Sequence, residues 1–214
     1  MATAKKWSNV AVAMQSAIGT ALTISAITKA NPGVVTSTAH GLSDGDYVYL
    51  EVQGMYQLNG RVARVAGKTT DTFQLEGIDT TAFDTFSSGT AQKLTFGTSI
   101  TTATTLSASG GDFDFIDTTT IHTNAKTQMP GLASPASYQF ENIWDVSDSG
   151  LLAMKAAADA QAIRAFKFTF GTGGQIMVFA GYCGATLLPG GSAQQLVTTG
   201  TVITMFGSPT YYAS

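Results

Sequence analysis

Few side chains in this sequence have the types and spacing that chemistry requires. The chain contains two histidines, His40 and His122, and a single cysteine, Cys183. A zinc site needs three or four Cys, His or carboxylate ligands close together, and neither histidine has such residues at ligand spacing. We therefore expect His40 to pack within a turn, Cys183 to act as a small buried hydrophobe, and the protein to hold no metal and no cofactor.

Three other segments resemble reactive motifs but lack an essential part. Asp44 and Asp46 do not belong to a calcium-binding loop of the helix–loop–helix type, so we expect a turn. The glycines of Phe170–Ile176 lie between two expected strands, without the lysine and following helix of a phosphate-binding loop, so we expect a hairpin. Ser192 lacks the G-x-S-x-G elbow of hydrolases. Since no reactive groups converge, we expect no catalytic residues and no enzyme.

An acidic strip is the remaining chemical feature. Asp112, Asp114 and Asp117 are three carboxylates in a short stretch that otherwise alternates with Phe113 and Phe115. The strip could face a passing polyanion, or it could be the solvated face of a strand, and the residues alone leave both interpretations open.

The composition indicates a folded chain with an unusual surface. The chain has 214 residues, of which 44% are hydrophobic and only 12% charged, against about 25% charged in a typical soluble domain. Such a surface suits a chain covered by copies of itself, or a Thr/Ser/Gly-rich extracellular β domain. The net charge of −3 and the absence of a basic stripe argue against tight nucleic-acid binding. No apolar run is long enough to span a membrane, and the resemblance of the N-terminus to a signal peptide is weak.

One helix is expected, over residues 148–164. Leu151, Met154, Ala158 and Ala162 recur at helical spacing, widened by Leu152, Ala156 and Ile163; Asp148 precedes them as a cap. The period then changes to two, because Phe166, Phe168 and Phe170 alternate with smaller or polar residues. An apolar helix stripe needs a sheet to cover, so we expect a mainly β fold, a sandwich or barrel with one flanking helix.

Residues 21–92 are expected to form a small inserted β module. Five short apolar runs recur there at regular spacing, separated by the turn segments NPG, SDGD, LNG and TTD. Adjacent ends near residues 20 and 93 would allow insertion into a parent domain. That parent, residues 1–20 and 93–214, begins with a polar segment containing Trp7 and a strand at residues 10–14.

The rest of the parent domain is expected to be strands and one long loop. Residues 118–135 contain few apolar residues and two prolines, which predicts a loop without secondary structure that orders on assembly. A strand at residues 136–144 precedes the helix. Three strands at residues 165–170, 175–184 and 195–206 then form an antiparallel meander.

Two resemblances extend these expectations. Part of the insert, AHGLSDGDYVYLEVQGMYQLNGRVARV, resembles a small β module found repeatedly in phage virion proteins, through His40, Gly41, Leu42, Gly45, Asp46, Leu58, Asn59 and Gly60. Residues 94–209 resemble the major tail tube protein of long-tailed bacteriophages. The order of DFIDTTTI, MPGL, strand, helix, Phe-rich hairpin and FGSP carries this resemblance, through Ile116, Asp117, Thr118, Thr119, Gly131, Leu132, Phe168, Gly174, Phe179, Gly181, Gly200, Gly207 and Pro209.

The tail tube resemblance implies a structural virion protein. It implies hexameric rings, closed through a shared inner β-barrel, that stack into a tube for DNA ejection. It further implies contacts with tail tip and tail terminator proteins, with the tape measure protein and with DNA in transit, no membrane, and assembly in the host cytoplasm. The sequence departs from the family in its insert and in the Thr-rich segment with His122, where the family has an acidic residue.

Two sets of site residues follow as hypotheses. The acidic strip gives lumen-facing residues, Asp112 and Asp114. The long loop and the N-terminal segment give an inter-ring contact formed by Trp7, Thr118, Thr119, Thr120, Ile121, His122, Met129 and Leu132.

A different class of function also fits the composition. A monomeric carbohydrate-binding or adhesin-type β domain would need an exposed aromatic platform, for which Tyr47, Tyr49 and Tyr56 are the candidates. Assembly into rings or tubes separates this alternative from the tail tube.

Overall fold

The computed structural model describes residues 9–171 and 173–213 of the chain. Within these residues it has one α-helix, α1 (Ser149–Asp159), and a short 3-10 helix at Tyr56–Leu58. The strands are β1 (Val10–Ile24), β2 (Ala26–Ile27), β3 (Val34–Thr36), β4 (Tyr47–Gln53), β5 (Val62–Ala66), β6 (Thr72–Leu75), β7 (Ser88–Ile100), β8 (Ala103–Ser109), β9 (Phe113–Asp117), β10 (Gln128–Ala133), β11 (Ser137–Ile143), β12 (Ile163–Phe170), β13 (Ile176–Ala185) and β14 (Thr198–Tyr212).

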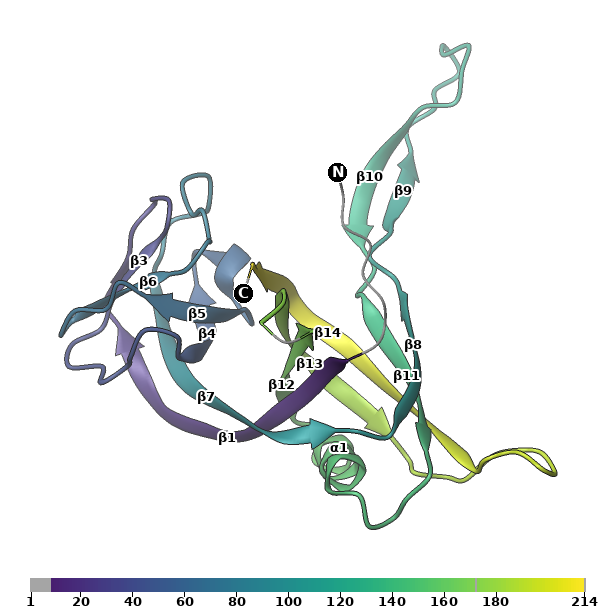
Figure 1. Cartoon of the computed structure of the whole chain (residues 1–214). Helices are drawn as coiled ribbons and strands as arrows, with labels where there is room; N and C mark the ends of the chain where they lie inside the picture. Colours follow the sequence, from purple (N-terminus) through teal and green to yellow (C-terminus); the bar gives the residue numbers. More distant parts are fainter. Residues whose placement is uncertain (1–8, 172, 214) are drawn as a thin grey trace.

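Twelve strands form one antiparallel sheet in the order β2-β3-β6-β5-β4-β7-β1-β12-β13-β14-β11-β8, while β9 and β10 form a separate hairpin. The half from β1 to β8 folds over on itself. Two strands separate β11 from β12 in the ladder, yet the rings of Tyr138 and Phe168 lie 5.4 Å apart between centroids. The predicted class, a mainly β sandwich or barrel with one flanking helix, is confirmed (Figure 1).

An aromatic core fills the folded half of the sheet. Phe179 of β13 stacks on Phe166 and on Phe168, both at 5.6 Å between ring centroids. Met154 of α1 and Phe140 of β11 are buried in the same cluster. The predicted alternation in β12 is therefore confirmed: Phe166 and Phe168 point into this core, which we call the sandwich core, and α1 packs beside it on β13.

The helix is shorter than the predicted range of 148–164. Asp148 is the N-cap, and its carboxylate accepts a hydrogen bond of 2.8 Å from the backbone N–H of Leu151. The helix ends at Asp159 because Gln161 takes a φ of 49°, after which the chain enters β12. The widened stripe was wrong at Leu152 and Ala156, whose side chains are exposed, and at Ile163, which is the first residue of β12.

A long antiparallel ladder between β1 and β7 joins the two halves of the sheet. Beyond it, β7 pairs with β4 and β1 pairs with β12. Ala21 and Gln92 are direct partners in this ladder, so the proposed ends of the inserted module lie side by side.

Residues 21–92 have a hydrophobic core of their own. Every buried residue of that cluster lies between Ile24 and Ala91, and Phe73 and Leu50 are among its fully buried side chains. A third cluster joins this segment to the side of β12 and β13 that points away from the sandwich core. There Tyr49 and Val62 pack in one cluster with Val178.

Polar contacts of the C-terminal strand strengthen that junction. The Arg64 guanidinium lies 4.4 Å from the ring centroid of Tyr212. The backbone N–H of Arg64 donates to the Tyr212 hydroxyl at 2.6 Å. Arg64 also donates to the Glu76 carboxylate, and Arg61 donates to the Thr210 hydroxyl at 2.9 Å. Burial raises the pKa of Tyr212 to about 12. The end of β14 therefore holds β5 against the sandwich.

We propose that residues 21–92 are a removable module, and excision tests this. Joining residue 20 to residue 93 through a short Gly/Ser linker should leave the sandwich core intact, because the ends already face each other across the ladder. We expect cooperative thermal unfolding at a lower midpoint, since the sandwich loses the cover of Tyr49 and Val62. Gradual melting without a transition would instead show that these strands belong to the main fold.

Candidate assembly interface

A two-stranded hairpin, residues 111–134, projects from the end of β8 and β11; we call it the arm (Figure 1). Its foot bends at Gly110 and Gly111, which take φ values of 82° and 86°. A Cβ on Gly110 would lie only 2.3 Å from the carbonyl oxygen of Pro135, so glycine is required there. Every residue from Ser107 to Pro130 is exposed. The arm thus has no core of its own.

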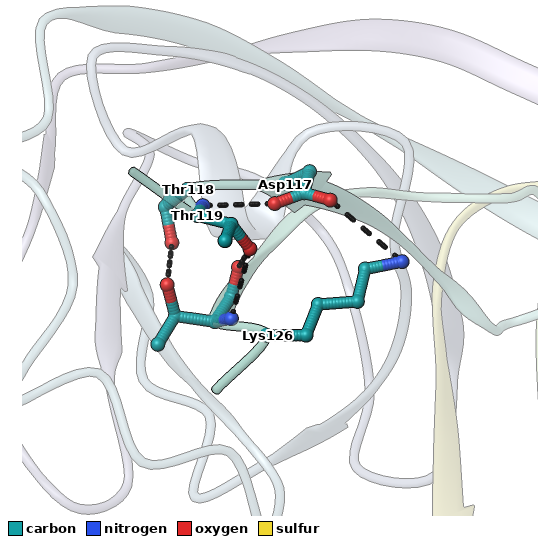
Figure 2. A network of polar contacts seen from close by, with 5 residues as sticks. Asp117, Thr118, Thr119 and Lys126 are labelled. Carbon is teal, nitrogen blue, oxygen red and sulfur yellow. Dashed lines mark hydrogen bonds and ion pairs between the residues drawn. The ribbon is translucent and has the colours of Figure 1, made fainter. Parts of the chain in front are cut away.

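Hydrogen bonds order the end of the arm (Figure 2). The backbone N–H of Thr118 donates to the carbonyl of Thr127 at 2.9 Å, and that of Thr127 donates to the Thr119 hydroxyl at 3.1 Å. Asp117 accepts from the Thr119 backbone N–H at 2.8 Å and lies 3.7 Å from the Lys126 ammonium. Hydrogen bonds from Thr119 lower the pKa of the Asp117 carboxyl. Hydrogen bonds of threonine side chains, together with backbone hydrogen bonds, therefore hold the end of the arm in shape without a buried apolar core.

The prediction of a loop over residues 118–135 is wrong in its second half. Residues Gln128–Ala133 form β10, which pairs with β9 through Met129 opposite Ile116 and Pro130 opposite Phe115. Backbone hydrogen bonding in an exposed ladder needs no apolar alternation, and proline is tolerated on an edge strand. Neither property leaves a clear pattern in the sequence.

The arm carries an unusual number of exposed apolar side chains. Ile121 at its tip is 95% exposed, and Leu132 near its foot is 87% exposed. The predicted inter-ring residues Thr118, Thr119, Thr120, Ile121, His122, Met129 and Leu132 all lie on the arm and are exposed, whereas Trp7 lies outside the described residues. Phe113, Phe115 and Ile116 are further exposed apolar residues of the arm. Uncovered apolar groups in this number indicate a contact surface.

The acidic strip divides between the two faces of the arm. Successive strand residues point to opposite faces, so Asp112 and Asp114 share one face. Asp117 lies on the opposite face and pairs with Lys126. All three are exposed. The lumen-facing role of Asp112 and Asp114 stays a proposal.

An open sheet edge lies next to the arm. In the described part of the chain, β8 pairs with β11 on one side and with no strand on the other. Its sequence, ATTLSAS, has neither a charge nor a proline, the features with which proteins usually protect an edge. A groove of about 380 Å³ runs beside it, lined by Val10, Val12, Leu106 and Phe140 among others. This edge is suited to pairing with another chain.

The outer face of β8, β11 and β14 is a second uncovered surface. Phe140 and Ile203 point into the sandwich core, so Gln139 and Glu141 point the other way. Exposed residues on this face include Thr105, Ser107, Ser109, Gln139, Glu141, Gly200 and Thr204, together with the apolar Ile143 at the end of β11 and Phe206 further along β14. The three strands contain no Lys or Arg, and Glu141 is their one acidic residue. The sequence analysis missed this face because only strand register brings Thr105 beside Glu141.

The remaining candidate residues have structural roles. His40 is buried, accepts from the Leu42 backbone N–H at 3.0 Å and contacts the Thr72 carbonyl, so it packs within a turn as predicted. Asp46 accepts from the Ser43 backbone N–H and pairs with Lys93 at 2.7 Å. The described residues contain no group of three His, Cys, Asp or Glu placed to hold a metal ion.

Cys183 and the tyrosines are also accounted for. Burial raises the pKa of the Cys183 thiol to about 11. Tyr49 is buried, and Tyr47 packs edge-on against Phe96 at 5.4 Å; of the three tyrosines, Tyr56 alone is exposed. The flat aromatic platform that a carbohydrate-binding domain would need is therefore not formed by them.

Comparison with known proteins identifies the family to which the chain belongs. A family model described as "Phage tail tube protein, TTP" matches residues 53–214, and the match begins inside the 21–92 segment. The chain has no match among curated proteins. No helix in the described residues is long and apolar enough to cross a membrane. Because the family match covers most of the sequence, the chain belongs to the phage tail tube protein family and is a structural component of a phage tail.

Proposed function

We propose that this chain forms hexameric rings that stack into the tail tube, the conduit for DNA ejection. The observation that carries this proposal is the open β8 edge, which leaves a row of backbone N–H and C=O groups for a neighbouring copy. The opposite end of the sheet is β2, only two residues long, and so short an edge offers little to pair with. Lateral contact with a neighbouring copy at β8 would cover the open β8 edge and the apolar groove beside it at the same time.

The outer face of β8, β11 and β14 supports an assignment to the lumen. A channel for DNA has to avoid strong phosphate neutralisation, which would hold the polyanion in place. Thr105, Gln139 and Thr204 offer small neutral groups on this face, and Glu141 adds a negative charge. The helix α1 packs on the opposite, core side of the sandwich. Asp112 and Asp114 would extend the same acidic character onto the arm.

The arm supports an axial contact between rings. Its exposed apolar side chains have no partner surface within the described part of the same chain, and a neighbouring ring would supply one. The partners that follow are copies of this chain along the tube, tail tip and tail terminator proteins at its ends, and the tape measure protein and DNA within it. Assembly in the host cytoplasm and a role without catalysis belong to the same proposal.

Electron microscopy of the purified protein tests the assembly. Negatively stained samples over a range of concentrations should show rings or hollow tubes, because the β8 edge and the arm remain uncovered in a single copy. Sedimentation should show the corresponding large species. A compact monomer at every concentration would contradict the proposal and would favour the monomeric carbohydrate-binding or adhesin-type domain.

Charge reversal tests the lumen assignment. Thr105→Lys with Glu141→Lys places two positive charges on neighbouring strands of the outer face. Virions carrying this pair should assemble but release DNA more slowly, with the delay larger at low salt. The matched variant Asp112→Lys with Asp114→Lys places the same number of lysines on the arm.

The two variants separate the candidates. Slow release from the arm variant alone would move the lumen surface to Asp112 and Asp114. Normal release rates from both variants, at low and high salt, would exclude both surfaces from the channel.

A further inference from the structure

A second exposed apolar surface lies at the other end of the sandwich. Two loops and the start of α1 contribute it: the segment after β11 and the long connection between β13 and β14. We call it the base patch, and its exposed apolar residues are Ile143, Val146, Leu152, Leu188, Leu196 and Val197. In the described residues, more than half of the exposed large apolar side chains outside the arm belong to the base patch.

The base patch is held in shape by hydrogen bonds between its two loops. The Trp144 indole N–H donates to the Leu187 carbonyl at 2.9 Å, and the Trp144 backbone N–H donates to the Val197 carbonyl at 2.9 Å. Gly190 and Thr198 form a further backbone bridge. The loops are thus tied together while Leu188 and Leu196 point to solvent, 72% and 66% exposed.

The arm and the base patch lie at opposite ends of the same strand. β11 starts at Ser137, beside the foot of the arm, and ends at Ile143 in the base patch. Figure 1 shows the arm projecting from one end of β8 and β11 and the β13–β14 connection extending beyond the other. Two different surfaces at opposite ends of one molecule meet only when copies are arranged head to tail, and such a contact repeats into a filament.

We infer that the base patch binds the arm of a second copy of this chain in the next ring. This inference rests on the proposed tube and names the surface that receives its axial contact. Burial of apolar area is the driving force, because both surfaces are net acidic. The arm carries Asp112, Asp114 and Asp117 against Lys126, and the base carries Asp145 and Asp148 without a basic residue.

Two properties follow from this chemistry. Salt screens the repulsion between the acidic groups, so ring stacking should strengthen as ionic strength rises. A single arm–base contact is small, but between two rings all copies bind together, and each contact after the first is effectively intramolecular. Rings should therefore stack under conditions in which single subunits do not associate head to tail.

Cross-linking in assembled full-length protein tests the inference. In a Cys183→Ala background, an arm cysteine (Ile121→Cys or Leu132→Cys) is combined with a base cysteine (Leu188→Cys), and a short bis-maleimide is added because a disulfide would demand closer geometry. We expect at least one arm–base pair to give a ladder of covalent multimers, while each single-cysteine variant stays monomeric on a denaturing gel. Tyr56→Cys, exposed on the inserted module, replaces the base cysteine in the matched control.

Each outcome decides the matter. Tubes with no arm–base ladder, or with an equal ladder for the Tyr56→Cys pairing, would overturn the inference and leave the tube proposal standing. Absence of tubes in the unmodified protein would overturn both.

As a second measurement, Leu132→Asp and Leu188→Asp should each shorten tubes at least several-fold at fixed concentration, whereas Tyr56→Asp should not. Unchanged tube lengths for both leucine variants would contradict the inference.

Discussion

The antiparallel ladder between β1 and β7 is the interaction on which the rest of the structure depends. Each strand continues past the other into a different part of the sheet, so β7 reaches β4 and β1 reaches β12. The ladder thereby fixes the 21–92 segment and the sandwich in one sheet. Arg64, Tyr212 and Arg61 then close the junction from the C-terminal strand. The body of the molecule fills its cores with its own residues, whereas the β8 edge and the arm are left uncovered.

The surfaces that a single chain leaves uncovered are those that do not contribute to its aromatic core. Phe166, Phe168 and Phe179 concentrate burial on the inner face of the sandwich, and the outer face of β8, β11 and β14 keeps small polar groups. The β8 edge retains unpaired backbone groups, and the arm is ordered by threonine hydrogen bonds in place of a core. In a tail tube protein these are the features that copies of the same chain can complete, since backbone pairing and apolar burial each need a second surface.

Local pattern predicted much of the body of this fold and little of its surfaces. Alternation located β12, and Asp148 located the start of α1, because both signals involve neighbouring residues. Leu152 was misplaced on the buried stripe because the face of α1 that packs on the sheet is the one carrying Leu151, Met154 and Ala157, and an apolar residue next to that face has the same signal in the sequence. The second strand of the arm, β10, was missed since an exposed ladder needs no apolar period, and Pro130 argued against a strand. The outer face depends on register between residues such as Thr105, Glu141 and Gly200, and the base patch depends on contacts of Trp144 with Leu187 and Val197. No local window of the sequence contains either set.

Amide hydrogen exchange along β8 tests the central claim, that this edge is paired in the assembled tail tube. In an antiparallel edge strand, alternate N–H groups bond to β11 and the others point outward. In the isolated subunit the outward amides of Ala103–Ser109 should exchange rapidly, and in purified tubes they should become protected. The same fast exchange in subunit and tube would contradict the account, because it would show that β8 remains an open edge after assembly.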